Sequence, residues 1–184
     1  MAVIHQTTGL TYADYYELPD DGNRYEIIDG VLHVSPAPSE KHQRSITGLL
    51  EQVGPHVRRT GLGRVYVAPF DIVFEDRSVV QPDLVFIGRE RLAILTEANV
   101  QGAPDLAIEV LSPSTRSYDL RQKREAYARF GVRYYWLVDP LAQTIEAHEL
   151  IGDTYELIGS ATGAANFSAA PFADLPIDLS LLWD

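Results

Sequence analysis

Two carboxylates interrupt short apolar runs in which a charge is costly to bury. Asp83 follows Pro82 at the start of the run Leu-Val-Phe-Ile, and Glu109 lies within Leu-Ala-Ile-Glu-Val-Leu. A buried carboxylate needs a partner. If the two runs form neighbouring strands, their oxygens can share one divalent cation, as Mg²⁺ is held by one or two carboxylates together with water and substrate phosphate. Alternatively, Asp83 merely begins a strand and Glu109 pairs with an arginine.

A second group of polar side chains follows at helical spacing. Asp119, Lys123 and Tyr127 are four residues apart, which places them on one face of a helix. The chain has only two lysines, and the ammonium of Lys123 is a compact donor that can orient a water or offset charge on a phosphate. The plainer interpretation is an ion pair within the helix between Lys123 and Asp119, worth only about 0.2–0.5 kcal/mol.

Two further candidates lie nearer the N-terminus. Glu26 stands in Arg-Tyr-Glu-Ile-Ile-Asp-Gly, where strand alternation turns it to the face opposite Tyr25 and Ile27. His42, near the start of a predicted helix, is a candidate phosphate contact or proton carrier, although a histidine in this position is also commonly structural or exposed. The sequence has no Gly-rich phosphate loop, nucleophile elbow or His-x-x-x-His pair, which argues against NTPases, α/β-hydrolases and zincins.

The elements that must position these residues alternate between strands and helices. Asp29-Gly30 predicts a tight hairpin between strands 25–28 and 31–35, Ser39 can cap a helix that runs to about residue 59, and Gly131 ends a helix over 119–130. We expect a short helix over 12–18 after Thr11, a loop over 159–170, and further strands over 63–68, 71–74, 83–87, 106–111, 134–138, 144–150 and 154–158. The pattern predicts one α/β or α+β domain over residues 1–184, with a mixed sheet flanked by helices.

Composition narrows the class of protein. The 184 residues are 46% hydrophobic and carry a net charge of −11, which excludes an overall basic coat for nucleic acid. Two basic segments could still form one local face, since residues 41–64 hold five bases against one acid, and residues 116–133 six against two. The absence of cysteine excludes disulfides, zinc–thiolate sites and thiol nucleophiles. No run reaches the ~18 apolar residues of a membrane span, and the first six residues form no secretory signal, so we expect a cytoplasmic protein without membrane contact.

These segments, in this order, resemble the Uma-two (Uma2) family of restriction-endonuclease-like proteins, a branch of the PD-(D/E)xK nuclease superfamily. The resemblance rests on Arg-Tyr-Glu-Ile-Ile-Asp-Gly, Gln-Pro-Asp-Leu-Val-Phe, Ala-Pro-Asp-Leu-Ala-Ile-Glu-Val-Leu-Ser-Pro-Ser-Thr and Tyr-Asp with a lysine four residues later, and it spans about residues 11–155. It implies a restriction-endonuclease-like core, with a mixed β-sheet flanked by helices. It also implies phosphodiester hydrolysis with Mg²⁺ or Mn²⁺, and nucleic acid as partner, DNA favoured over RNA. A homodimer is the assembly considered.

The resemblance also implies roles for individual residues. Asp83 and Glu109 correspond to the two metal carboxylates, and Glu26 to an acidic residue from the N-terminal part. The superfamily usually places its lysine two residues after the second carboxylate, where this chain has Leu111, so the resemblance implies that Lys123 has taken over the role. His42, Asp119 and Tyr127 are accessory candidates. The alternatives are a catalytically inactive module that binds nucleic acid or protein, and a structural or regulatory homodimer.

Overall fold

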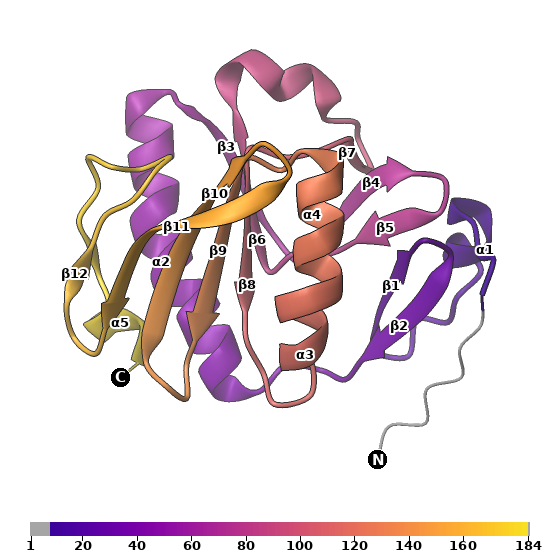
Figure 1. The fold of residues 1–184 in the computed structure, drawn as a ribbon, viewed down its shortest axis with the longest axis horizontal. Helices are drawn as coiled ribbons and strands as arrows, with labels where there is room; N and C mark the ends of the chain where they lie inside the picture. The colour runs from indigo at the N-terminus through magenta and orange to yellow at the C-terminus, as the bar shows by residue number, and fades with distance from the viewer. Residues whose placement is uncertain (1–7, 184) are drawn as a thin grey trace.

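Two mixed β-sheets, with helices between and around them, make up the computed structural model of the protein, which describes residues 8–183 (Figure 1). The first six residues, for which the sequence predicts no secretory signal, lie outside the described residues. The five-stranded sheet has the order β2-β1-β5-β4-β7. Its strands are β1 Arg24–Ile28, β2 Val31–Ser35, β4 Asp71–Glu75, β5 Ser78–Val80 and β7 Asn99–Gln101.

The six-stranded sheet has the order β11-β10-β9-β8-β6-β3 and is antiparallel except for the parallel pair of β8 and β9. Its strands are β3 Gly63–Val67, β6 Leu84–Gly88, β8 Leu106–Val110, β9 Tyr134–Asp139, β10 Thr144–Ile151 and β11 Thr154–Thr162. A short pair, β12 Asn166–Phe167 and β13 Ile177–Asp178, follows. The helical segments are α1 Tyr12–Tyr16, α2 Glu40–Thr60, η1 Arg89–Ile94, α3 Arg116–Tyr118, η2 Asp119–Lys123, α4 Arg124–Phe130 and α5 Ser180–Trp183.

Local chemistry explains several of these boundaries. Asp29 and Gly30 both have positive φ, 54° and 77°, as a two-residue turn matched to the strand twist requires. The Ser39 hydroxyl caps α2, and Gly61 ends that helix in the left-handed conformation. Gly131, with φ 80°, ends α4 in the same way.

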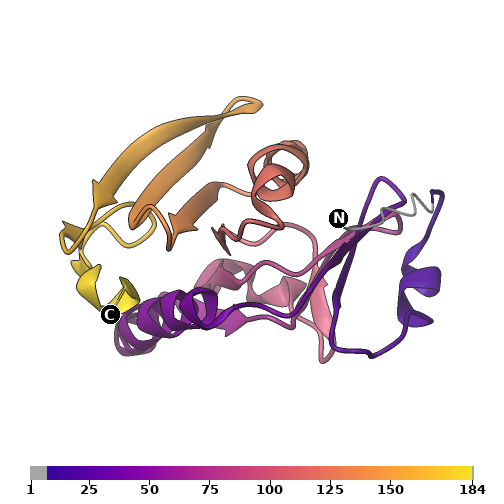
Figure 2. The same ribbon diagram turned by 90° about the horizontal axis from the view of Figure 1, so that it is seen from below.

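The six-stranded sheet, the central sheet of the fold, is covered on both faces, which explains why β6, β8 and β9 are apolar and buried almost throughout. On one face, Leu84, Leu106 and Ile108 pack with Leu49 and Val53 of α2 and with the C-terminal segment. On the other face, alternating residues of the same strands pack with α4 and with the five-stranded sheet. Figures 1 and 2 show α2 and α4 on opposite sides of these strands. Residues 83 and 109 alternate toward the α4 side.

The predicted mixed α/β (α+β) fold with flanking helices is confirmed, with differences in detail. The predicted strand 83–87 begins one residue later, at Leu84, which is the first residue of β6 to pair with β8 and β3. Residues 159–162, predicted as loop, continue β11, because β10 is long enough to pair with them, for example Thr144 with Thr162. The helix predicted from residue 119 begins at Arg116 and contains a π-helical segment.

The chain also changes sheets more often than the sequence suggests. The strands on either side of Pro69 belong to different sheets, and neither β5 nor β7 was predicted. In the part of the chain that the structure describes, no helix combines the length and the apolar character needed to cross a membrane.

The crossing of α2 and α5 gives a test of the packing. Gly48 lies in α2, and a Cβ added there would lie against the backbone carbonyl of Leu181. We therefore expect Gly48→Ala to lower the free energy of unfolding by about 1–3 kcal/mol, an overpacking cost that exceeds the gain in helix propensity. Urea unfolding measures this. Thr47→Ala, an exposed neighbour in the same helix, should leave stability unchanged or slightly higher, and an equal response of the two variants would contradict the packing described.

Candidate active site

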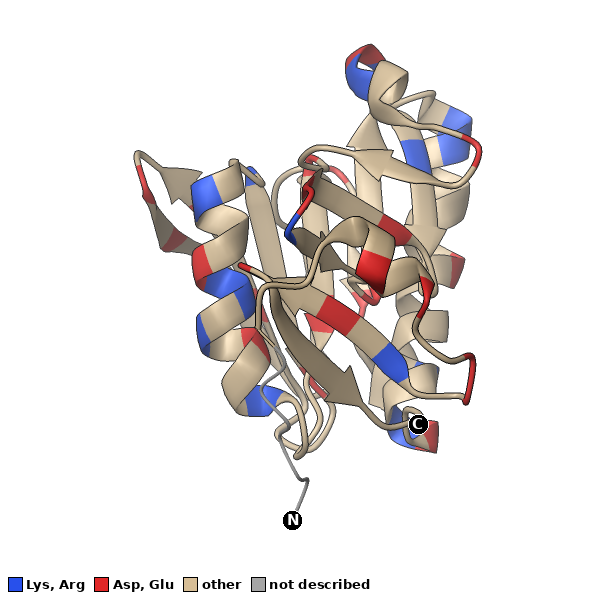
Figure 3. Ribbon diagram, turned by 90° about the vertical axis from the view of Figure 1, so that its right-hand side faces the viewer, with Lys and Arg blue, Asp and Glu red and all other residues tan. Residues whose placement is uncertain are grey.

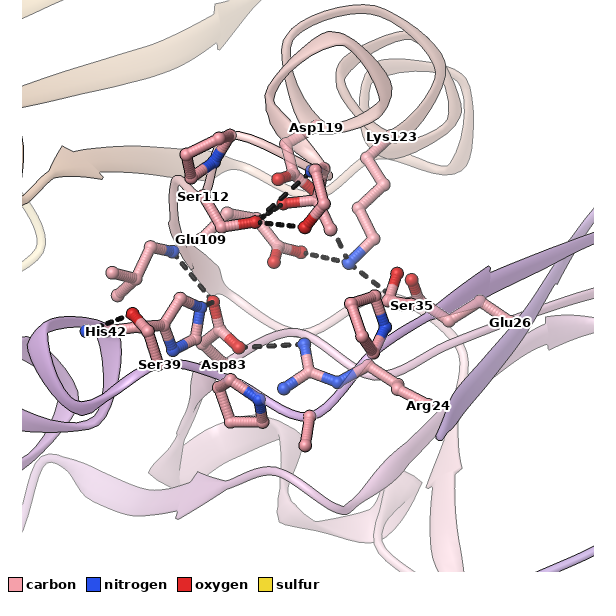
Figure 4. Close-up of a pocket in the computed structure, with 17 residues that line it drawn as sticks. Arg24, Glu26, Ser35, Ser39, His42, Asp83, Glu109, Ser112, Asp119 and Lys123 are labelled. Atoms are coloured by element: carbon pink, nitrogen blue, oxygen red, sulfur yellow. Dashed lines mark hydrogen bonds and ion pairs between the residues drawn. The ribbon is translucent and has the colours of Figure 1, made fainter. Parts of the chain in front are cut away.

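The side chains of Asp83 and Glu109 face one cavity at the ends of two paired strands. Leu84 of β6 pairs with Ile108 of β8, so the preceding Asp83 lies opposite Glu109. The cavity has a volume of about 150 Å³, and both carboxylates line it (Figure 4). Each side chain is about 1% exposed. The strand register thus brings together two acids that are 26 positions apart in the sequence.

Lys123 connects the two sheets and the helix. Its Nζ lies 2.8 Å from Oε1 of Glu26 on β1 and 2.9 Å from Oε1 of Glu109 on β8. Asp119, one turn earlier, is 3.8 Å from the same nitrogen. Lys123 is only 1% exposed. The ion pair with Asp119, the plainer interpretation of the sequence, is the longest of its three contacts. The ammonium is a buried ion-pair centre rather than a solvated helix lysine.

The carboxylates that surround this lysine are themselves held in place. Glu26 Oε1 accepts a hydrogen bond of 2.7 Å from the backbone N–H of Gln81. Glu109 Oε1 accepts one of 2.5 Å from the Tyr127 hydroxyl. The π-helical segment η2 supplies Asp119 and Lys123, and the backbone carbonyl of Asp119 accepts a hydrogen bond from the Tyr135 hydroxyl. A π-turn of this kind is frequent at functional sites.

Asp83 has a different set of partners from those of Glu109. Its Oδ2 accepts a hydrogen bond of 2.8 Å from the backbone N–H of Val110 and lies 3.2 Å from Nε2 of His42. Its Oδ1 forms an ion pair of 2.8 Å with Nη1 of Arg24. Burial alone would raise the pKa of Asp83, but the hydrogen bond from His42 and the charge of Arg24 lower the pKa to about 2. Asp83 is therefore ionised at neutral pH.

Glu109 and Asp119 behave in the opposite way. Burial raises the pKa of Glu109 well above its usual range, and the charges of Asp119, Asp83 and Glu26 add to this effect against that of Lys123. Burial likewise raises the pKa of Asp119 to about 6, although Lys123 opposes it. Burial is the largest cause for both groups, and the negative charge of neighbouring carboxylates adds to it. Pairs of carboxylates whose pKa values are pushed apart are characteristic of catalytic sites.

All the residues singled out in the sequence lie together. Glu26, His42, Asp83, Glu109, Asp119 and Lys123 line the cavity, and Tyr127 contacts it through Glu109. The alternative in which Glu109 pairs with an arginine is wrong, since its cation is Lys123. The sequence reasoning missed Arg24, although this residue opens the motif that contains Glu26. The alternation that turns Glu26 inward turns residue 24 to the same face, and this signal could have identified it.

Each of the two basic segments contributes a residue to the cavity, but neither contributes an arginine. Segment 41–64 contributes His42, and segment 116–133 contributes Lys123. Arg116, Arg129 and Arg133 form ion pairs with Asp139, Asp29 and Glu149 elsewhere. Blue and red residues are interspersed in Figure 3 instead of forming one basic face.

The donor set of the cavity suits a hard divalent cation. Within residues 8–183, no three His, Asp or Glu side chains are arranged around a common point that could hold a metal, and Lys123 lies between two of the carboxylates. Four carboxyl groups nevertheless face two permanent cations, Arg24 and Lys123, so the cavity carries a charge of −2 when all are ionised. Mg²⁺ and Mn²⁺ prefer carboxylate oxygens. Asp83 and Glu109 are the residues that would hold such an ion.

Comparisons with known proteins agree with this picture. The sequence profile of the family described as "Uma2: Putative restriction endonuclease" matches residues 12–180. The uncharacterized protein sll1609 of Synechocystis sp. is 25% identical over 166 residues, which cover 89% of this chain and 93% of that protein.

A crystal structure described as "a putative nuclease belonging to DUF820" from Anabaena variabilis superposes with a TM-score of 0.76 at 21% identity, covering 95% of this chain and 98% of the other. The two proteins therefore share a fold, and the resemblance predicted from the sequence is confirmed. Since the family profile spans nearly the whole chain, the protein belongs to the Uma2 family of restriction-endonuclease-like proteins.

Proposed function

We propose that this protein is a metal-dependent endonuclease that hydrolyses phosphodiester bonds in DNA, with Mg²⁺ or Mn²⁺ held by Asp83 and Glu109. One observation carries the proposal: a fully buried lysine lies between carboxylates from two sheets, in a cavity that Asp83 also faces. Membership of a family described as restriction endonucleases supports nucleic acid, and DNA in particular, as the substrate. When bound, a divalent cation would polarise the scissile phosphate and lower the pKa of a water.

The side chains of the cavity have complementary tasks in this proposal. His42 and the backbone N–H of Val110 hold the carboxylate of Asp83 in one orientation. The Tyr127 hydroxyl does the same for Glu109. His42 and Tyr127 are therefore positioning residues. Arg24, at the wall of the cavity, can donate to a phosphate oxygen.

Lys123 can act on the reacting atoms with one remaining donor. An ammonium has three N–H bonds. Glu109 accepts one of them at 2.9 Å, Glu26 forms an ion pair with the same nitrogen at 2.8 Å, and Asp119 at 3.8 Å is beyond hydrogen-bond distance. The third is available for the attacking water or for charge that develops on the phosphate. Electrostatic contacts of this kind are among the largest contributions to catalysis.

The same network also supports the alternative function, a nuclease fold that binds nucleic acid or protein without cleaving it. A lysine surrounded by three carboxylates is a self-sufficient structural unit, and Leu111 occupies the usual lysine position. The two functions differ in what the site requires. Hydrolysis depends on the carboxylates and the cation, whereas binding by an inactive module survives the loss of Asp83.

The first test is metal binding. We expect isothermal titration with Mn²⁺ to show binding that Asp83→Asn and Glu109→Gln each weaken by at least about tenfold, because each replaces a carboxyl ligand with an amide without changing the shape of the side chain. Glu156→Gln, an exposed glutamate on β11, is the matched control and should bind as the unmodified protein does. Equal Mn²⁺ affinity in all four proteins would remove Asp83 and Glu109 from the metal site.

The second test concerns Lys123. Lys123→Met keeps most of the side chain but deletes the charge, and we expect metal-supported cleavage of DNA to fall by about 10²-fold or more. Lys41→Met is the matched control, because Lys41 is the other lysine of the chain and is exposed. If Lys123→Met alone fails to fold, its combination with Glu26→Gln removes one charge of each sign. Cleavage at the unmodified rate by a folded Lys123→Met variant would exclude the catalytic role.

The third test is the pH dependence of stability without metal. The pKa of Asp119 is about 6 in the folded protein, above its value of about 4 in an unfolded chain, so the folded state binds this proton more tightly. The stabilisation is complete below about pH 4 and is lost as the pH rises through 6. In buffer with EDTA, Asp119→Asn should therefore be more stable than the unmodified protein by about 1–3 kcal/mol at pH 7.5, and the difference should vanish near pH 4.

Urea unfolding at the two pH values measures this difference. Asp153→Asn, in the exposed turn between β10 and β11, serves as the control and should show no such dependence. A variant Asp119→Asn that is less stable at pH 7.5 would mean that the ion pair with Lys123 outweighs the burial of the carboxylate.

A further inference from the structure

A second, larger cleft adjoins the candidate active site. It has a volume of about 440 Å³, against about 150 Å³ for the first cavity. The two share one wall, formed by Arg24 and the segment 36–38. Clefts of roughly 300–1,000 Å³ are typical of small-molecule sites. The first cavity is large enough for a phosphate group, whereas the second has room for a larger group next to it.

Tyrosine rings in fixed orientations line this second cleft. Tyr16, from α1, is 60% exposed although it lies among aromatic neighbours. Its ring packs edge-on against Tyr12 and Tyr15, with centroids 5.0 and 6.4 Å away. Tyr15 is anchored in turn by a hydrogen bond of 2.7 Å from its hydroxyl to Asp71. An exposed aromatic ring that is already held in one orientation is suited to stacking with a flat ligand, because little conformational entropy is lost on binding.

Polar groups and charge limit what this ligand can be. Asn23 and Gln43 line the cleft and can exchange hydrogen bonds with the edge of a planar ring, whereas Gln81, whose amide nitrogen already donates to Tyr15 and Asp71, can only accept one. Residues 14–29 carry six acids against one base, so the surroundings disfavour a chain of phosphates. Arg24, at the wall shared with the first cavity, is the one base of that segment. A phosphate is therefore favoured only at the junction, and a group without negative charge, such as a planar base, is favoured beyond it.

We infer that the second cleft is a nucleoside subsite, which holds one unstacked base and its sugar against Tyr16 while the adjoining phosphate lies at Arg24 and in the first cavity. The inference rests on the proposed nuclease function and extends it to the class of substrate. A base can enter such a cleft only when it is not paired and stacked within a helix. The substrate is accordingly single-stranded DNA, or DNA with an unpaired nucleotide, rather than a regular duplex.

Binding of DNA, measured apart from cleavage, tests the inference. The probe is a fluorescein-labelled single-stranded oligonucleotide of mixed sequence, titrated by fluorescence anisotropy with the full chain in Ca²⁺, which takes oxygen ligands as Mg²⁺ does. The duplex of the same sequence is titrated in parallel. We expect the single strand to bind about tenfold or more tightly than the duplex. Tyr16→Ala should weaken single-strand binding by about tenfold, the usual effect of losing one base–aromatic stack, and should leave duplex binding unchanged.

Two controls separate stacking from a loss of structure. Tyr16→Phe retains the ring and should bind the single strand as the unmodified protein does, and Leu157→Ala changes an exposed side chain on β11. Equal affinity for the two forms of DNA, or unchanged single-strand binding by Tyr16→Ala, would overturn the inference.

Failure of the nucleoside subsite can be distinguished from failure of the proposed nuclease activity. Cleavage in Mg²⁺ that does not depend on Tyr16 contradicts the subsite and leaves the nuclease intact. Single-strand binding that depends on Tyr16, in a protein that cleaves no DNA, supports the subsite and contradicts the nuclease.

Discussion

The buried ammonium of Lys123 is the interaction on which the rest of the structure depends. Its partners come from β1, β8 and its own helix, so one cation fixes the five-stranded sheet, the six-stranded sheet and the helical segment 116–130 relative to one another. Ions in the interior are tolerated only when they are paired and hydrogen-bonded, and removing the cation from such a set of carboxylates costs about 3–5 kcal/mol. The contacts that hold the two sheets together at this point are therefore the same contacts that form the site.

This dependence also explains how a lysine can serve the site from a helix. Leu111, two residues after Glu109, lies in the apolar cluster between the central sheet and α4, where an ammonium would have no partner. The side chain of Lys123 instead extends from the helix to the carboxylates of Glu26 and Glu109. The π-helical segment places Asp119 and Lys123 on the side of the helix that faces the cavity. The polar contacts remain at the strand ends, and the apolar packing beneath the helix is uninterrupted.

What the sequence could predict was governed by local chemistry. Asp29-Gly30, Ser39 and Gly131 act within a few residues of themselves, so the hairpin and the helix limits could be found. The exchange of sheets around Pro69, the strands β5 and β7, and the π-turn depend on pairing between distant segments, for which no local pattern exists. The candidate residues emerged from spacing and family resemblance, but their connections did not. That Arg24 neutralises Asp83 while Lys123 serves Glu26 and Glu109 follows from how the two sheets meet.

The net charge of the molecule limits how the proposed nuclease can bind its substrate. A protein of net charge −11 repels nucleic acid over much of its surface, and five of its twelve arginines outside the cavity form ion pairs with acids. Little of its affinity can then come from a general release of counterions along one basic face, which is the usual source of non-specific binding. It has to come from a few contacts: a dication at Asp83 and Glu109, the guanidinium of Arg24 and the aromatic wall beyond it. Such an enzyme would bind most nucleic acid weakly and would bind tightly only a strand whose phosphate and base can enter the two cavities together.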